Sequence, residues 1–166
     1  NHSYWNLEKN KKKMIYNHEL KLNSAKYLQI NKNLIPTGRI KNVKKSIYDF
    51  SNFENIGKKL DYFKNKKVNI KFKGFDTTFV VKKNTRNLVG TLKNNNTNIQ
   101  VDFFSNLPGV QLYSAQNLNY KKKLFPYQGI CLETQYFPDA PNKKNFPSTL
   151  IKPNKRYTCF TKIKIS

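Results

Sequence analysis

Acidic residues are scarce in this chain, and the sequence also lacks several features that mark common protein classes. Only 9 of the 166 residues are Asp or Glu, against 32 Lys or Arg, which gives a formal net charge of +23. No apolar run approaches the roughly 18 residues that a membrane-spanning helix needs. With six glycines in all, no Gly-rich phosphate loop is present. We therefore expect no membrane segment and no nucleotide cofactor.

The two cysteines, Cys131 and Cys159, are too few for a disulfide framework. No CxxC pair and no Cys/His cluster indicates a metal site, so we expect neither a metal nor any other cofactor. We interpret both cysteines as reduced, partly buried thiols of a cytoplasmic protein.

The excess of positive charge raises nucleic acid as a partner, but its composition argues against that partner. Arginine, the residue preferred for phosphate and base contacts, occurs only three times, and the lysines are scattered among asparagines. We expect no nucleic-acid partner, and we interpret the lysine blocks at 11–13, 66–67 and 121–123 as solvated loops or strand edges.

Alternation with a period of two residues predicts a single, mostly β domain, since half-buried strands have this period. Turn signals such as "NLPG" and "PDAPN" separate the candidate strands. The predicted strands are 68–73, 79–83, 88–92, 98–104, 110–114, 129–137 and 156–165, the last with Tyr157, Cys159, Thr161, Ile163 and Ile165 on one face. One helix is predicted over 53–63, from the spacing of Phe53, Ile56, Leu60 and Phe63.

Few residues are suited to proton chemistry, so each can be weighed in turn. His18 has polar neighbours and is interpreted as exposed, whereas His2 lies next to Tyr4 and Trp5, as hydrogen-bonding groups lie beside aromatic rings in sugar sites. Asp139, in "FPDAPN", is expected to form a turn. Glu133 alternates with Ile130 and Leu132 and shares a strand face with Cys131 and Gln135, so it faces either solvent or a pocket.

Five motifs, in order, resemble those of the aldose 1-epimerase (galactose mutarotase) family: "NHSYWNL", "LIPTGRI", "GFDTTFVV", "LPGVQLYSAQNL" and "GICLETQYFPDAPNKKNFPSTLIKPNKRY". The resemblance implies an all-β fold, a large antiparallel β-sandwich, with the sugar in a cleft on one face. It also implies that residues 1–166 are the C-terminal part of one such domain, with the N-terminal half absent.

The resemblance further implies roles for four residues: His2 as general acid, Glu133 as general base, and Asp76 and Gln111 as sugar-binding residues. The expected activity is interconversion of the α and β anomers of a free aldohexose such as galactose or glucose, with no metal or cofactor. Thr77 and Thr78 depart from the family, which often has His-Asn after this aspartate, and we expect altered hydrogen bonding there without loss of the site.

Two other functions stay open on the sequence. One is a sugar-binding relative, or an inactive fragment, that keeps the fold without turnover. The other is an epimerase of hexose 6-phosphates, which would need cationic contacts for the phosphate. Retention of His2, Asp76 and Glu133 together argues against the first.

Overall fold

The computed structural model describes residues 1–65, 73–83, 86–121 and 123–166. None of the helices in these ranges is both long enough and apolar enough to cross a membrane. The elements, in chain order, are η1 (Ile15–Asn17), β1 (His18–Leu22), β2 (Lys26–Ile30), β3 (Pro36–Asn42), β4 (Glu54–Asn55), α1 (Ile56–Asn65), β5 (Asp76–Val80), β6 (Leu88–Asn94), β7 (Ile99–Ser105), β8 (Gly109–Tyr113), β9 (Cys131–Gln135), η2 (Ala140–Asn142) and β10 (Thr161–Ile165).

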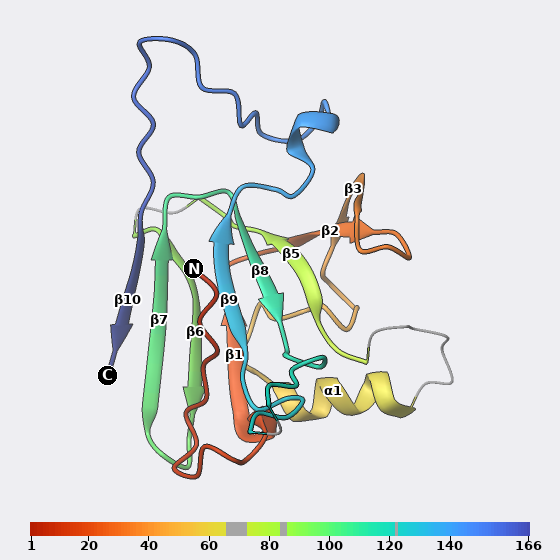
Figure 1. The fold of residues 1–166 in the computed structure, drawn as a ribbon, viewed down its shortest axis with the longest axis vertical. Helices are drawn as coiled ribbons and strands as arrows, with labels where there is room; N and C mark the ends of the chain where they lie inside the picture. The colour runs from red at the N-terminus through yellow and green to blue at the C-terminus, as the bar shows by residue number, and fades with distance from the viewer. Residues whose placement is uncertain (66–72, 84–85, 122) are drawn as a thin grey trace.

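The strands form two antiparallel sheets, which confirms the mostly β prediction (Figure 1). The first sheet has the order β10-β7-β6-β1-β4, and the second has the order β3-β2-β5-β8-β9. Apolar side chains from both sheets pack into one core, including Leu20, Leu92 and Phe103 from the first sheet and Phe79 and Leu112 from the second. All five are fully buried, so each contributes on the order of 1.5–3 kcal/mol through burial.

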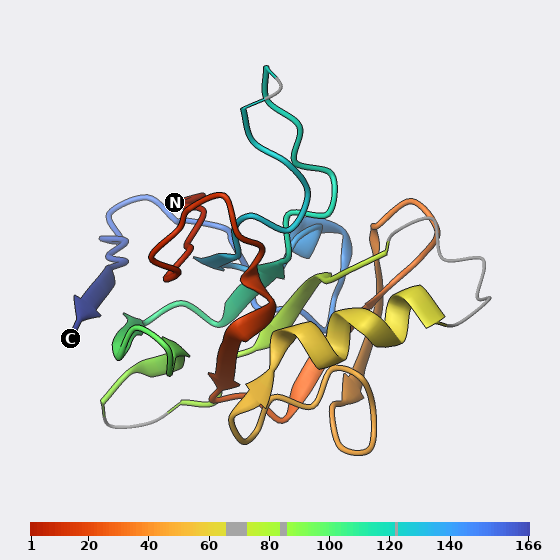
Figure 2. The ribbon, with the colours of Figure 1, turned by 90° about the horizontal axis from the view of Figure 1, so that it is seen from below.

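The predicted helix exists, but it begins three residues later than expected. Ile56 and Leu60 are buried and Phe63 nearly so, whereas Phe53 lies outside the helix and is exposed. The Asn55 side chain accepts a hydrogen bond from the Lys58 backbone N–H, which caps the helix at its N-terminus. Helix α1 lies beside η1 and β1 (Figure 2). Gly57 allows the close approach to η1, because a Cβ atom there would lie 2.6 Å from the Tyr16 carbonyl oxygen.

Most of the predicted strands are present, with ends displaced by up to three residues. Strands β5 to β9 correspond to the predictions at 79–83, 88–92, 98–104, 110–114 and 129–137. The predicted strand at 68–73 lies outside the described residues. Strands β1 to β4 were not predicted, although β1 has the expected alternation, with its first, third and fifth residues buried.

The prediction of a strand over 156–165 is wrong for its first half. Only Thr161–Ile165 forms β10, and the chain from η2 to β10 makes an extended arch beyond the sheets (Figure 1). Tyr157 and Cys159 are exposed, so Cys159 is not the partly buried thiol that we expected, while Cys131 is buried. Ile165 is 63% exposed, because β10 is an edge strand that presents little apolar surface to the core.

The prediction that His18 is exposed is also wrong. Its side chain is fully buried at the start of β1, and Nε2 accepts a hydrogen bond of 2.7 Å from the Leu7 backbone N–H. Burial lowers the pKa of His18 from its ordinary value of 6.5 to about 4. A neutral imidazole with its proton on Nδ1 therefore fixes the 7–18 segment against the sheet.

This histidine predicts a loss of stability in mild acid. Because the folded pKa lies below the unfolded one, the stabilisation is complete above pH 6.5 and is lost as the pH falls towards 4, by at most about 3 kcal/mol. His18→Gln, which keeps an acceptor but cannot titrate, should flatten this part of the pH dependence in urea unfolding. His2→Gln, which removes the exposed histidine, should lose stability in mild acid to the same extent as the wild type. Equal slopes for wild type and His18→Gln would contradict this assignment.

Candidate active site

The pairing of three strands places polar side chains together on one face of the second sheet. Gln111 in β8 lies opposite Thr78 in β5 and opposite Glu133 in β9. Since side chains alternate between the two faces of a strand, Asp76 and Gln135 share this face. The intervening side chains point into the core and are buried, as are Thr77, Phe79, Val110, Leu112 and Leu132.

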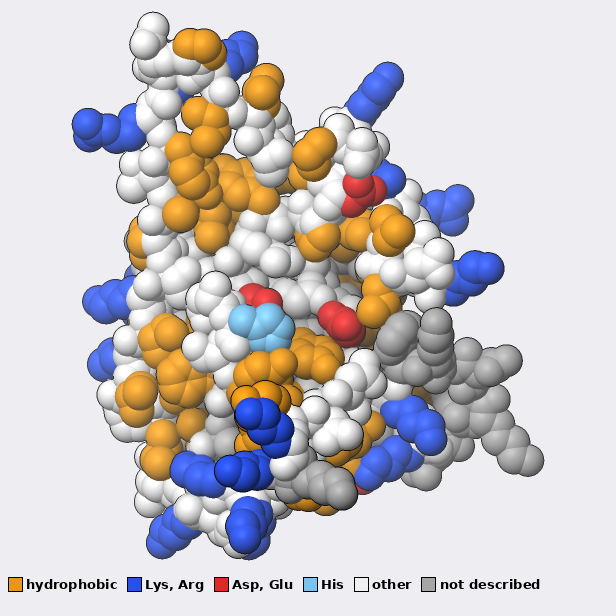
Figure 3. Space-filling model, in the orientation of Figure 1, with side chains coloured by type: hydrophobic (Ala, Val, Ile, Leu, Met, Phe, Trp, Pro, Cys, Tyr) orange, Lys and Arg blue, Asp and Glu red, His pale blue; other side chains and the backbone are white. Residues whose placement is uncertain are grey.

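A pocket of about 420 Å³ lies over this polar face. Its lining comes from β5, β8 and β9, from the N-terminal segment and from the residues that follow β9. The lining residues are His2, Tyr4, Asp76, Gln111, Tyr113, Glu133, Gln135 and Pro138. In Figure 3 the hollow near the middle of the visible face contains a histidine and two acidic side chains, while Lys and Arg lie mainly towards the margins. The structure thus brings all four predicted site residues, His2, Asp76, Gln111 and Glu133, to one place.

His2 and Glu133 lie in contact across the pocket. Nε2 of His2 is 3.6 Å from Oε1 of Glu133, and the His2 side chain is 55% exposed while that of Glu133 is 17% exposed. The imidazole stacks on Tyr4, with ring centres 5.0 Å apart, and meets the edge of Tyr113 at 6.1 Å. Two tyrosine rings therefore form an aromatic wall beside the histidine.

The segment that carries His2 is attached through its neighbours. Trp5 exchanges two backbone hydrogen bonds with Ile130, just before β9, of 2.8 and 2.9 Å. The Trp5 ring packs against Phe103 at 5.7 Å in the core, so the aromatic neighbour of the pocket is Tyr4 and not Trp5. Residues 1–4 form no strand, and Trp5 makes only an isolated bridge. Tyr4 lies over Gly129, where a Cβ atom would come within 2.9 Å of its side chain.

A chain of hydrogen bonds orients the aspartate. Gln111 donates from Nε2 to Oδ1 of Asp76 over 2.6 Å, and Thr78 donates from its hydroxyl to the Gln111 side-chain oxygen. Gln135 in turn donates to the Thr78 hydroxyl at 3.4 Å. Thr78 thus fixes which end of the Gln111 amide faces Asp76. Thr77 lies on the core face instead.

Burial shifts both carboxyl groups in the same direction. Burial raises the pKa of Glu133, with a smaller contribution from the charge of Asp76, although His2 and the chain's amino group oppose this shift. Burial likewise raises the pKa of Asp76, against the hydrogen bond from Gln111 and the charge of His2. Both carboxylates are therefore more basic than carboxylates in water.

Cys131 lies beneath the histidine on the same strand face as Glu133. Its sulfur is 3.5 Å from Nδ1 of His2, and burial raises its pKa to about 12, with further contributions from Glu133 and Asp76. One donor atom each from His2, Cys131 and Glu133 lies within 4.8 Å of the others, so these side chains have the types and spacing of metal ligands.

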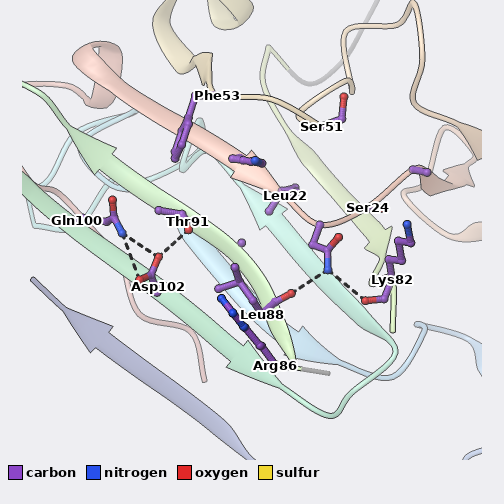
Figure 4. Close-up of a pocket in the computed structure, with 14 residues that line it drawn as sticks. Leu22, Ser24, Ser51, Phe53, Lys82, Arg86, Leu88, Thr91, Gln100 and Asp102 are labelled. Atoms are coloured by element: carbon purple, nitrogen blue, oxygen red, sulfur yellow. Dashed lines mark hydrogen bonds between the residues drawn. The ribbon is translucent and has the colours of Figure 1, made fainter. Parts of the chain in front are cut away.

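A larger hollow of about 710 Å³ lies elsewhere, on the face of the first sheet that points away from the core (Figure 4). Its carboxylate, Asp102, accepts hydrogen bonds from Thr91 at 2.6 Å and from Gln100 at 3.2 Å. No predicted site residue lines it. We place the candidate active site in the smaller pocket, because only that pocket joins a histidine to two carboxylates.

Four pocket residues were not among the predicted site residues: Tyr4, Tyr113, Gln135 and Pro138. The signal for Tyr113 and Gln135 was present, since each lies two residues after a predicted site residue on a strand. Asp139 lies in a turn, as predicted, with a left-handed backbone conformation. Its carboxylate bonds the side chains of Asn142 and Lys143 rather than the backbone.

Comparison with known proteins agrees with the family resemblance seen in the sequence motifs, both in sequence and in fold. The aldose 1-epimerase family model matches residues 1–164. The chain is 33% identical to galactose mutarotase of Bos taurus and 31% identical to that of Homo sapiens, each over all of this chain and 48% of the relative. It is 25% identical to aldose 1-epimerase of Escherichia coli K12, over 97% of this chain and 48% of that protein.

Solved structures with low sequence identity share the fold. A homologue of aldose epimerase from C. elegans superposes with a TM-score of 0.84 at 21% identity, over 99% of this chain and 50% of the other. Galactose 1-epimerase from Lactobacillus acidophilus superposes with a TM-score of 0.70, also at 21% identity, over 92% of this chain and 45% of the other. The chain thus spans about half the length of the relatives that it matches, and it belongs to the aldose 1-epimerase family.

Proposed function

We propose that this chain carries the acid and base of a mutarotase, which interconverts the α and β anomers of a free aldohexose. The observation that supports this most directly is the contact between His2 and Glu133 at one end of a pocket that also contains Asp76 and Gln111. The family relationship and the galactose mutarotases among the relatives support the same reaction class.

In the proposed mechanism, Glu133 takes the proton of the anomeric hydroxyl while His2, as an imidazolium, gives a proton to the ring oxygen. The bond between the anomeric carbon and the ring oxygen breaks, and an open-chain aldehyde forms. Rotation about the next carbon–carbon bond turns the carbonyl over, and the reverse transfers close the ring on its other face. Both residues return to their starting states, so no co-reactant is consumed.

The other pocket residues are suited to holding the sugar during this rotation. Asp76 and the amide of Gln111 accept and donate bonds to hydroxyls, while the rings of Tyr4 and Tyr113 offer apolar surfaces for the carbon skeleton. The raised pKa of Glu133 makes it a stronger base, and its carboxylate lies in contact with the His2 imidazole, the proposed acid.

A free hexose fits this pocket better than a hexose 6-phosphate. The lining, all of it within the described residues, contains no Lys or Arg that could bind a phosphate. A sugar-binding protein without turnover is less consistent with the site, because binding alone would not require a base with a raised pKa next to an acid. We propose a small-molecule sugar as the partner, no nucleic-acid or membrane partner, and a cytoplasmic location.

The test of this function is Glu133→Gln in the whole protein, with whatever sequence precedes Asn1. The amide keeps the size of the side chain but cannot accept the proton, so turnover should fall about a hundredfold or more while sugar binding changes little. Polarimetry of freshly dissolved α-glucose and α-galactose measures the rate. Asp102→Asn, which removes a carboxylate in the larger hollow, is the matched control and should keep wild-type turnover. Near-normal turnover of Glu133→Gln would remove this residue from the mechanism.

A second prediction concerns Thr78, which bonds Gln111 but is not among the residues that line the pocket. Thr78→Val keeps the shape but loses the hydroxyl, so the Gln111 amide is no longer held with its nitrogen towards Asp76, and the pKa of Asp76 should rise further. Thr78→Ser should restore the wild-type value. Titration of the Asp76 carboxyl carbon by NMR measures this effect without any turnover. An unchanged pKa in Thr78→Val would show that Gln111 needs no such support.

A third prediction concerns residues 1–166 produced alone. His2 is 55% exposed and the pocket opens to solvent, so the acid is not held in a packed shell. Displacement of a catalytic group by about 1 Å can cost on the order of a hundredfold in rate. We expect this polypeptide to give no acceleration of mutarotation and to associate through the exposed apolar residues of the arch and β10, such as Leu150, Ile151 and Ile165. A cooperative melt together with clear acceleration would refute the expectation.

A further inference from the structure

We propose that His2, Cys131 and Glu133 form a binding site for a thiophilic divalent cation of the zinc class, and that this cation inhibits the protein. The site would not serve catalysis, since the proposed mutarotation moves only protons. Binding of the ion depends on these side chains alone, whereas the inhibition rests on the proposed function.

The Cys131 sulfur and the His2 imidazole are spaced as two ligands of one zinc ion. Two ligand atoms on a tetrahedral zinc, one nitrogen and one sulfur, lie about 3.5 Å apart, given bond lengths near 2.0 and 2.3 Å. The distance between Nδ1 of His2 and Sγ of Cys131 is 3.5 Å. The two strongest zinc ligands of the group are therefore already at the spacing that the ion requires.

The carboxylate supplies the third ligand. Its oxygen lies within 4.8 Å of the other two donor atoms, and Cys131 and Glu133 project from the same face of β9. At present Oε1 contacts the other imidazole nitrogen, Nε2, at 3.6 Å, so a change of side-chain torsions in Glu133 is needed to bring it to the ion. Three protein ligands leave a fourth position for water, which the adjoining pocket can supply.

Local charge and access are both compatible with a cation. Asp76 lines the same pocket, so two carboxylates lie near the ion, and no Lys or Arg is among the lining residues. The net charge of +23 acts at longer range and is screened over about 8 Å at physiological ionic strength. Cys131 itself is buried, but its cover includes His2, whose side chain is 55% exposed and can move aside.

The ligand set selects the class of ion. One sulfur, one imidazole nitrogen and one carboxylate oxygen suit zinc and cobalt(II), whereas magnesium and calcium prefer oxygen ligands throughout. On binding, the Cys131 S–H bond breaks, a metal–sulfur bond forms and the proton goes to the solvent. The ion would then occupy a lone pair of Glu133 that the proposed base needs, and would keep His2 from forming the imidazolium that the proposed acid needs.

Cobalt(II) titration of the reduced, metal-free whole protein tests the site by absorption spectroscopy. We expect one equivalent to bind with the visible bands of tetrahedral cobalt and a near-ultraviolet thiolate-to-cobalt charge-transfer band, and zinc to displace it. Cys131→Ser should abolish the charge-transfer band. Cys159→Ser is the matched control, because Cys159 is the other free thiol and is exposed, and it should keep the wild-type spectrum.

Two further variants keep the test independent of how well Cys131→Ser folds. His2→Gln and Glu133→Gln alter partly exposed side chains, so both variants should fold. Loss of a partner that only supports a metal ligand weakens metal binding by roughly tenfold to hundredfold, and loss of a ligand itself should weaken cobalt binding by at least that factor. No charge-transfer band in the wild type, or a band lost in Cys159→Ser but kept in Cys131→Ser, would overturn the site. Cobalt binding as predicted without zinc inhibition of mutarotation would leave the site standing and contradict the proposed roles of His2 and Glu133.

Discussion

The register of β5, β8 and β9 is the constraint on which the candidate site depends. Gln111 lies between Thr78 and Glu133 because these residues are direct partners in the antiparallel pairing. The same pairing sends Phe79, Val110 and Leu132 into the core. A shift of one residue in any of the three strands would exchange the two faces of that strand, burying polar groups and exposing apolar ones. The hydrophobic core therefore specifies the geometry of the polar face.

The scarcity of acidic residues makes the electrostatics of the pocket stand out from the rest of the molecule. Two of the nine acids, Asp76 and Glu133, lie on one half-buried face, and burial raises the pKa of each. Among the described residues, the Gln111 amide offsets this burial for Asp76 and the His2 imidazole offsets it for both carboxyl groups. The network that orients hydroxyl-binding groups thus also opposes the rise in the pKa of these two carboxyl groups.

How far the sequence predicts the molecule depends on whether a feature is set locally. Strand β7 alternates clearly, so its existence and its buried face followed from the pattern. Strands β5, β6, β8 and β9 were predicted only as short strands between turn signals, and the strand at 129–137 put Glu133 and Gln135 on one face. His18 was misjudged because its burial comes from a distant partner, the Leu7 backbone, and not from its polar neighbours in β1. Likewise the backbone pairing of Trp5 with Ile130, 125 positions along the chain, decides that Tyr4 faces the pocket. Tyr157 and Cys159 alternate as strand residues do, but no paired strand continues β10 that far.

The two groups proposed to move protons are held very differently. Glu133 belongs to a strand whose five residues all pair with β8, so its backbone is fixed on one side by a full ladder. His2 lies three residues before a single backbone bridge. Its side chain is held by contacts with the rings of Tyr4 and Tyr113, the Cys131 sulfur and the Glu133 carboxylate. An aromatic pair contributes about 0.5–1.5 kcal/mol of interaction free energy, which favours one position of the side chain but is weaker than a ladder of backbone hydrogen bonds. The backbone of Glu133 is therefore held more firmly than that of His2, so the geometry of the pair depends mainly on how the segment that carries His2 is held.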